Sequence, residues 1–201
     1  MCEATPPGYY SSAGMAKPSR CGAASFFCRG NGSATPSVVQ KGYISVPVQT
    51  EPDARIGEEP CPAGAWCSAG IAVPCERSYY AQMSLPLEMR TDASACRQCP
   101  KFSVSEEAST SIEQCQCMAG YYDNETSSGK VSCQPCTAGT DGCVANGTTT
   151  VTLNISAGWY RTSSLSVDLR RCPDGSNKDS GCVGGIGDEG PCKPCAASLV
   201  L

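Results

Sequence analysis

The sequence predicts a small disulfide-rich protein, built as an elongated tandem array of cysteine-rich repeats with short β-hairpins and little other regular structure. Three observations support this prediction. The chain has 17 cysteines in 201 residues, a content close to that of disulfide scaffolds. Leu, Ile, Val and Phe together account for only 28 residues, too few for an ordinary apolar core. Gly and Pro account for another 36, so turns should interrupt the chain throughout.

Cross-links between cysteines are therefore expected to replace the missing core. A disulfide typically stabilises a fold by about 2–4 kcal/mol, and it needs an oxidising compartment. The connectivity stays open, but pairing should be local. Cys115 and Cys117 are too close to bridge each other and should have different partners. One cysteine must be unpaired or intermolecular, with Cys2 and Cys195 the leading candidates. The disulfide-forming set comprises Cys2, Cys21, Cys28, Cys61, Cys67, Cys75, Cys96, Cys99, Cys115, Cys117, Cys133, Cys136, Cys143, Cys172, Cys182, Cys192 and Cys195.

A second signal of an oxidising environment comes from asparagine. Four of the five asparagines begin an Asn-x-Ser/Thr triplet, which is the acceptor sequence for N-glycosylation on exposed loops of secreted proteins. The predicted acceptors are Asn31, Asn124, Asn146 and Asn154. No apolar leader is visible at the start of the chain, so we expect a mature or excerpted segment of a longer, secreted protein.

The aromatic residues recur at a regular spacing. A small residue followed by aromatics occurs five times, and successive first aromatics lie 34, 36, 42 and 38 residues apart. The small residue favours a turn, often with positive φ, and the aromatics supply most of the buriable surface of each unit. We expect them to pack over a disulfide or over the next unit. The packing aromatics are Tyr9, Tyr10, Tyr43, Trp66, Tyr79, Tyr80, Tyr121, Tyr122, Trp159 and Tyr160.

Regular secondary structure should be sparse. Short strands are predicted at residues 38–39, 43–49 and 148–156, and in the last of these Thr and Val alternate before Asn154. Residues 93–96 could form one helical turn, and no segment sustains a helical apolar stripe.

Several stretches resemble the ephrin-receptor-like cysteine-rich repeats, relatives of the TNF-receptor and EGF-like modules. These stretches are CEATPPGYYSSAG at residue 2, CPAGAWCSAGIAVPC at residue 61 and CRQCPKFSVSEEASTSIEQCQCMAGYYDN at residue 96. The ending GWYRTSSLSVDLRRCPDGSNKDSGCVGGIGDEGPCKPC, from residue 158, is similar to a segment that often follows such repeats in large surface proteins of algae, oomycetes and other protists. The resemblance implies architecture more than function, since these repeats serve as spacers, ectodomains and filament components.

Five units follow from the repeat spacing. They are a first cysteine-rich unit with a β-rich connector at 1–60, a second at 61–95 and an ephrin-receptor-like unit at 96–132. A fourth, with the Thr/Val strand, covers 133–171, and an incomplete C-terminal unit covers 172–201.

Catalytic and metal chemistry find little support in the sequence. The chain has no histidine, which removes the Ser-His-Asp and Cys-His nucleophile systems. Three Cys-x2-Cys pairs have zinc-ligand spacing, yet the many further cysteines favour disulfides. A pI of about 4.9 does not suit nucleic-acid binding. We therefore predict no enzyme activity, no catalytic residue, no metal site, no cofactor and no nucleic-acid partner.

The function predicted from these observations is structural. We expect an extracellular, N-glycosylated structural or interaction protein, part of a cell-surface or extracellular filament assembly. Its partners would be proteins, either copies of itself or other surface or filament glycoproteins, together with its N-linked glycans. No membrane span is expected within this segment, because its apolar runs are too short. The alternative is the ligand-binding ectodomain of a cell-surface receptor.

Overall fold

The computed structural model describes residues 5–48, 55–125, 127–176 and 180–186. They fall into two compact units. Unit 1 runs to Gln98 and also takes in Glu106–Ser111, and unit 2 comprises Cys99–Ser105 and the chain from Ile112 onward. Each unit is described separately below.

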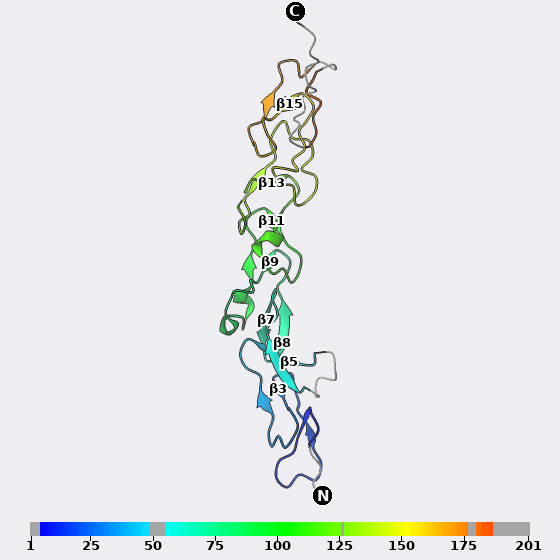
Figure 1. Cartoon of the computed structure of the whole chain (residues 1–201), viewed down its shortest axis with the longest axis vertical. Coiled ribbons are helices and arrows are strands. Elements are labelled where there is room, and N and C mark those ends of the chain that lie inside the picture. Colours follow the sequence, from blue (N-terminus) through cyan, green and yellow to red (C-terminus); the bar gives the residue numbers. More distant parts are fainter. Residues whose placement is uncertain (1–4, 49–54, 126, 177–179, 187–201) are drawn as a thin grey trace, which may run out of the picture. The chain divides into compact units, whose positions relative to one another are not determined.

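Unit 1 is a succession of two-stranded antiparallel hairpins in chain order (Figure 1). The pairs are β1–β2, β3–β4, β5–β6, β7–β8 and β9–β10. Their bounds are Tyr9–Tyr10 and Ser19–Arg20, Phe26–Phe27 and Ser37–Val38, Tyr43–Val46 and Gly57–Pro60, Ala65–Ser68 and Ile71–Pro74, and Tyr79–Tyr80 and Arg97–Gln98. The 3₁₀ helices η1 (Leu87–Met89) and η2 (Ala93–Ala95) lie between β9 and β10 in the chain.

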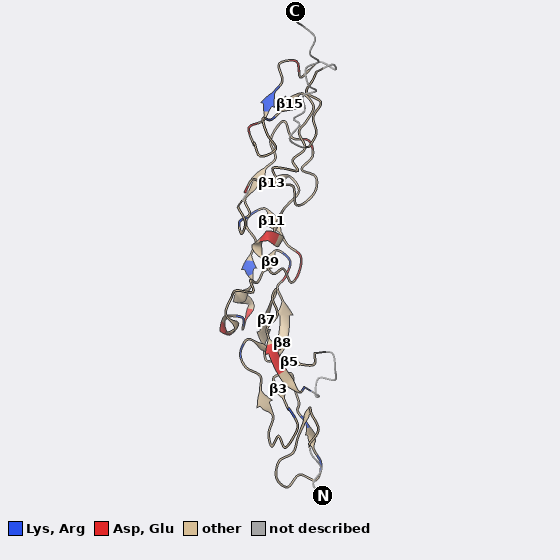
Figure 2. Cartoon of the chain, in the orientation of Figure 1, with Lys and Arg blue, Asp and Glu red and all other residues tan. Residues whose placement is uncertain are grey.

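Unit 2 repeats the same arrangement with fewer elements. Its hairpins are β11–β12, β13–β14 and β15–β16. Their bounds are Ser103–Val104 and Gln116–Cys117, Tyr121–Asp123 and Cys133–Pro135, and Trp159–Tyr160 and Arg170–Arg171. The 3₁₀ helix η3 covers Ile112–Gln114. Charged residues are spread along both units in short runs rather than gathered in one block (Figure 2).

Local sequence explains why these strands turn back so tightly. The β7–β8 hairpin is connected by Ala69 and Gly70, with φ of 49° and 77°. Positive φ at both central residues is what a two-residue type I′ turn requires, and its twist matches that of the flanking strands. The Gly70 position also excludes a side chain, because a Cβ there would lie 1.8 Å from the carbonyl oxygen of Ala24.

Cystines form most of the interior. Of the 20 buried hydrophobic residues in the described part of the chain, 11 are cysteines. One cluster in unit 1 contains Ile44, Cys61 and Cys67. Another, in unit 2, contains Tyr122, Cys143, Leu153 and Ile155. The predicted fold class, a small disulfide-rich protein with short β-hairpins and little regular structure, is confirmed.

The predicted strands meet with mixed outcomes. Of the strand predicted at 38–39, Val38 ends β4 and Val39 lies outside it. Of the strand predicted at 43–49, β5 covers Tyr43–Val46, and Gln49 lies outside the described residues. The 3₁₀ helix η2 covers most of the helical turn predicted at 93–96. The strand predicted at 148–156 is wrong, since only isolated bridges form there, at Thr149 and Ile155. The reason is local: Thr149 N–H donates to Thr152 Oγ1 at 2.9 Å, and Thr152 N–H donates to Thr149 Oγ1 at 3.3 Å. Such hydroxyl bonds offer the backbone an alternative to a strand ladder.

Candidate functional site

The turn before the aromatic residues of each copy, a pair in four copies and Tyr43 alone in the fifth, has the backbone conformation expected from the sequence. Its residue has positive φ in all five copies: 83° at Gly8, 79° at Gly42, 68° at Ser78, 88° at Gly120 and 82° at Gly158. Ser78 takes the left-handed conformation even without being glycine. The fold therefore requires this turn, and glycine is the residue that adopts it at least cost.

In three copies, one disulfide closes around this glycine through two backbone hydrogen bonds. The first cysteine donates its N–H to the glycine carbonyl, and the glycine N–H donates to the carbonyl of the second cysteine. In unit 1 these bonds measure 2.9 and 2.8 Å around Gly8, with Cys21 and Cys28. We call this arrangement the glycine–disulfide closure.

The other two closures lie in unit 2. Gly120 is bracketed by Cys136 and Cys143, with hydrogen bonds of 2.9 and 2.6 Å. Gly158 is bracketed by Cys172 and Cys182, and both of its hydrogen bonds measure 2.9 Å. The glycine, the aromatic pair and the two cysteines thus act as one building block. In these three copies the closure explains why the glycine and its aromatic pair precede two cysteines that bond to each other.

All 14 cysteines in the described part of the chain form disulfides with near neighbours in sequence. The separations run from 6 to 21 residues. Cys115 pairs with Cys99 and Cys117 with Cys133, so the prediction of different partners for the two is confirmed. The full set is Cys21–Cys28, Cys61–Cys67, Cys75–Cys96, Cys99–Cys115, Cys117–Cys133, Cys136–Cys143 and Cys172–Cys182. Cys2, Cys192 and Cys195 lie outside the described residues.

Two of these bridges join cysteines on opposite sides of an expected unit boundary. Cys75–Cys96 spans the boundary at 95/96, and Cys117–Cys133 spans the one at 132/133. Hairpins β9–β10 and β13–β14 span the same two positions. Four of the cysteines with zinc-ligand spacing, Cys96, Cys99, Cys133 and Cys136, are cross-linked in disulfides.

The ten packing aromatics are all at least partly withdrawn from solvent. Tyr80 and Tyr122 are buried, and the other eight are half-buried. Tyr122 lies in one cluster with Cys143, and Cys136 and Trp159 pack against it. Sequence reasoning missed Phe27, which is 4% exposed. The Phe-Phe pair directly before Cys28 was the available signal.

The predicted glycosylation asparagines differ in their access to solvent. Asn31, Asn124 and Asn146 are exposed, whereas Asn154 is half-buried. Asn31 lies in a turn with φ of 47°. Of the triplet that begins at Asn124, Thr126 lies outside the described residues.

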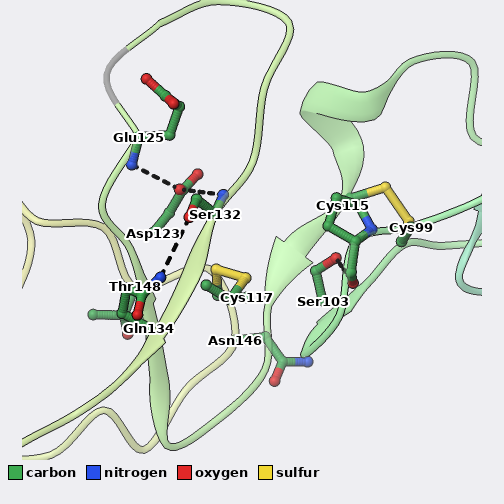
Figure 3. Close-up of a disulfide and its surroundings, with 12 residues drawn as sticks. Cys99, Ser103, Cys115, Cys117, Asp123, Glu125, Ser132, Gln134, Asn146 and Thr148 are labelled. Carbon is green, nitrogen blue, oxygen red and sulfur yellow. Dashed lines mark hydrogen bonds between the residues drawn. A yellow bond between two sulfur atoms is a disulfide. The ribbon is translucent and has the colours of Figure 1, made fainter.

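The loop that carries Asn124 is organised by one carboxylate (Figure 3). Asp123 Oδ1 accepts the N–H of Glu125 at 3.0 Å and the N–H of Ser132 at 2.9 Å. The two ends of the loop are thus tied to one side chain, and the Cys117–Cys133 disulfide lies beside them. Asn124 therefore lies at the exposed surface next to backbone that these two hydrogen bonds hold in place.

Asn146 occupies a second position near the same disulfide (Figure 3). Its Oδ1 accepts the N–H of Ala119 at 3.0 Å, and the next residue, Gly147, donates its N–H to the Cys117 carbonyl at 2.7 Å. The amide oxygen of Asn146 is therefore used inside the protein. Glycans attach through the amide nitrogen, so this hydrogen bond is compatible with glycosylation of Asn146.

Three buried arginines were missed entirely by sequence reasoning. Arg55, Arg90 and Arg161 are 8%, 5% and 4% exposed. Arg161 Nη1 donates to the carbonyl oxygens of Thr150 at 2.5 Å and Ser164 at 2.9 Å. Arg90 donates to the carbonyl oxygens of Leu85, Cys61 and Met83. These guanidinium groups satisfy backbone carbonyls in irregular loops, which would otherwise be buried without hydrogen bonds.

Two exposed side chains have shifted pKa values. Two hydrogen bonds from Ser94 to the carboxylate of Asp92, which caps η2, lower the pKa of Asp92; the bond from the Ser94 side chain has the larger effect and the bond from its backbone N–H the smaller. The hydrogen bond and charge of Asp168 raise the pKa of Arg170. Neither shift is of the kind that prepares a catalytic acid or base.

The described residues define a class: a small disulfide-rich protein of closely spaced hairpins. Within them, no group of three or more Cys, Asp or Glu is placed to hold a metal ion. No helix in the same ranges has the length and apolar character to cross a membrane. The chain matches no family model, no curated protein and no solved structure.

Proposed function

We propose that this chain is an extracellular, N-glycosylated structural or interaction element, part of a cell-surface or extracellular filament assembly. The observation that carries the proposal is the pairing of all 14 described cysteines in disulfides. A chain that depends on this many cross-links needs an oxidising compartment to fold, and disulfide-rich proteins are typical of secretion.

The exposed asparagines support the same compartment. Asn31, Asn124 and Asn146 lie on the surface in acceptor triplets. Glycans at these positions would cover exposed loops. The faces without them would be left for protein partners, either copies of this chain or other surface glycoproteins. The resemblance to ephrin-receptor-like repeats agrees with this role, because such repeats occur in surface proteins.

The alternative is a ligand-binding receptor ectodomain, and one observation favours it. A cavity of about 600 Å³ lies within unit 1, lined by residues that include Trp66 and Tyr79. Small-ligand sites in proteins fall in this range of volume. A receptor would engage its partner through one such localised patch, whereas an assembly component would use several surfaces.

Expression in a eukaryotic secretory host tests the proposal. We expect the secreted chain to carry N-glycans at Asn31, Asn124 and Asn146, with lower occupancy at Asn154, measured by peptide mass spectrometry. Static light scattering then separates the two roles. Concentration-dependent growth in mass supports an assembly component, and a stable monomer at all concentrations favours the receptor. Secretion without any N-glycan would contradict the proposal.

A further inference from the structure

The cavity in unit 1 combines aromatic and acidic side chains. Trp66 of β7 and Tyr79 of β9 line it, together with the Cys75–Cys96 disulfide. Glu76 and Glu107, both exposed, also line it. Neither lysine nor arginine is among the described residues that form its wall.

The segment that carries Glu107, Glu106–Ser111, contacts the rest of unit 1 at several points. The N–H of Ala108 donates to the Cys75 carbonyl at 2.8 Å, and the N–H of Ala81 donates to the Ser109 carbonyl at 3.0 Å. Ala108 also approaches Gly64 so closely that a Cβ on Gly64 would lie 2.1 Å from the Ala108 carbonyl oxygen. Glu107 is thus held on the cavity wall by the backbone contacts of the two residues that follow it, Ala108 and Ser109.

Arg77, the basic residue next to Glu76 in the sequence, is already paired with another carboxylate. Arg77 Nη2 lies 2.7 Å from Glu106 Oε1 in an exposed ion pair. That pair uses Glu106 and leaves the carboxylates of Glu76 and Glu107 on the cavity wall. Carboxylates attract a cation by direct charge, and aromatic rings that line the same cavity add the attraction of their quadrupole.

We propose that this cavity binds an arginine or lysine side chain presented by a different, basic protein. The inference names the chemistry of a partner for the interaction element proposed above, and so rests on that proposal. The overall charge favours a different protein over a second copy. The chain carries 19 acidic and 15 basic side chains, for a net charge of −4, so at this cavity the charge favours a basic protein over a second copy, whatever other surfaces of the chain bind.

The test follows Trp66 by NMR in the intact, disulfide-bonded chain. The chain has two tryptophans, so the W159F variant assigns the indole N–H of Trp66. The probes are the N-acetyl methylamides of arginine and lysine, with those of citrulline and norleucine as neutral analogues. We expect the two cationic probes to shift the Trp66 indole signal and the neutral analogues to have little effect.

Charge-removing variants give the second arm. The double variant E76Q/E107Q should weaken binding of the lysine and arginine probes about fivefold, and added salt should weaken binding to the unaltered chain. E88Q removes an exposed carboxylate of unit 1 that does not line the cavity and should bind as the unaltered chain does. All three glutamates are exposed, so these variants should fold.

Three results would overturn the inference: equal shifts with the neutral analogues, no shift with any probe, or unchanged affinity in E76Q/E107Q. If a second copy of the chain displaces the cationic probes from the Trp66 cavity, the cavity would be assigned to self-association, and the choice of partner would be overturned. Failure of this inference can be distinguished from failure of the proposed function, because glycan occupancy and growth in mass are measured without any probe.

Discussion

The rings of Phe102 and Tyr121 stack face to face in unit 2, with centroids 4.3 Å apart and planes inclined by 9°. Phe102 has φ of 63°, a left-handed conformation that is unfavourable for a residue with a bulky side chain. Its carbonyl accepts the N–H of Met118 at 2.8 Å, much as the carbonyls of Gly8, Gly120 and Gly158 accept the N–H of a cysteine. We expect the stack with Tyr121 to offset the cost of placing phenylalanine at this turn.

Two substitutions of Phe102 distinguish the stabilisation that the ring stack provides from the cost of the left-handed backbone conformation. Phe102→Ala removes a stack worth about 0.5–1.5 kcal/mol and keeps the left-handed cost. Phe102→Gly removes the same stack but relieves the backbone by about 1 kcal/mol. We expect the Met118 N–H to exchange fastest with solvent in Phe102→Ala and more slowly in Phe102→Gly. Equal exchange in the two variants would mean that the turn conformation costs nothing here.

The turn glycines should differ in their tolerance of alanine. Gly120 has φ of 88° and open space where a Cβ would lie, whereas a Cβ on Gly64 would meet the Ala108 carbonyl oxygen at 2.1 Å. Gly120→Ala should therefore cost about 1 kcal/mol, the price of conformation alone. Gly64→Ala adds a steric clash with backbone and should cost clearly more. Thermal unfolding under non-reducing conditions compares the two, and a Gly120→Ala variant at least as unstable as Gly64→Ala contradicts the assignment.

Arg161 should not be replaceable by lysine. Its guanidinium reaches the carbonyl oxygens of Thr150 and Ser164 at once, and an ammonium group lacks this planar fork of donors. We expect Arg161→Lys to destabilise unit 2 by about 1–3 kcal/mol, because buried carbonyls lose their donors. The exposed Arg171→Lys is the matched control and should change little. Denaturant unfolding measures both, followed by tryptophan fluorescence in a W66F background where Trp159 is the remaining tryptophan, and similar midpoints for both would refute a structural role for Arg161.

Thiol chemistry tests the disulfides directly. Alkylation without reduction should label none of the 14 paired cysteines, as read by peptide mass spectrometry. Removing one bridge with Cys117→Ser and Cys133→Ser together should cost about 3 kcal/mol, given a separation of 16 residues. Strong reductant should unfold the whole chain. Native amide protection after full reduction would show that the apolar clusters suffice without the bridges.

Asp92 should lose its capping role only under acid. Hydrogen bonding to Ser94 lowers the pKa of Asp92 below its usual value of about 3.9. A carboxyl with a depressed pKa stabilises the fold fully above its unfolded-state pKa, and this contribution disappears as the pH falls through the lower folded-state value. The carboxyl carbon of Asp92 and the amide of Ser94 should therefore titrate together in NMR spectra below the usual range. Titration at the ordinary value would mean that the cap does not form in solution.

Much of this architecture could be read from the chain because it is local. The turn residue before the aromatic residues of each of the five copies has positive φ, as the recurrence of glycine there predicted. Cys115 and Cys117 were expected to have different partners because neighbouring cysteines cannot bridge each other comfortably. The predicted strand at 148–156 failed, since a Thr/Val pattern does not reveal that Thr149 and Thr152 bind each other's backbone.

The sequence alone determined the class of this protein, because cysteine content and the shortage of apolar residues decide which forces are available to order a chain. Only the tertiary structure decided which cysteines pair, which arginines are buried and where aromatic and acidic side chains meet in unit 1. Each of these depends on segments brought together across loops, as when Arg90 reaches the Cys61 carbonyl at 3.0 Å. Composition and spacing do not predict such contacts, because the contacts depend on how the hairpins pack against one another.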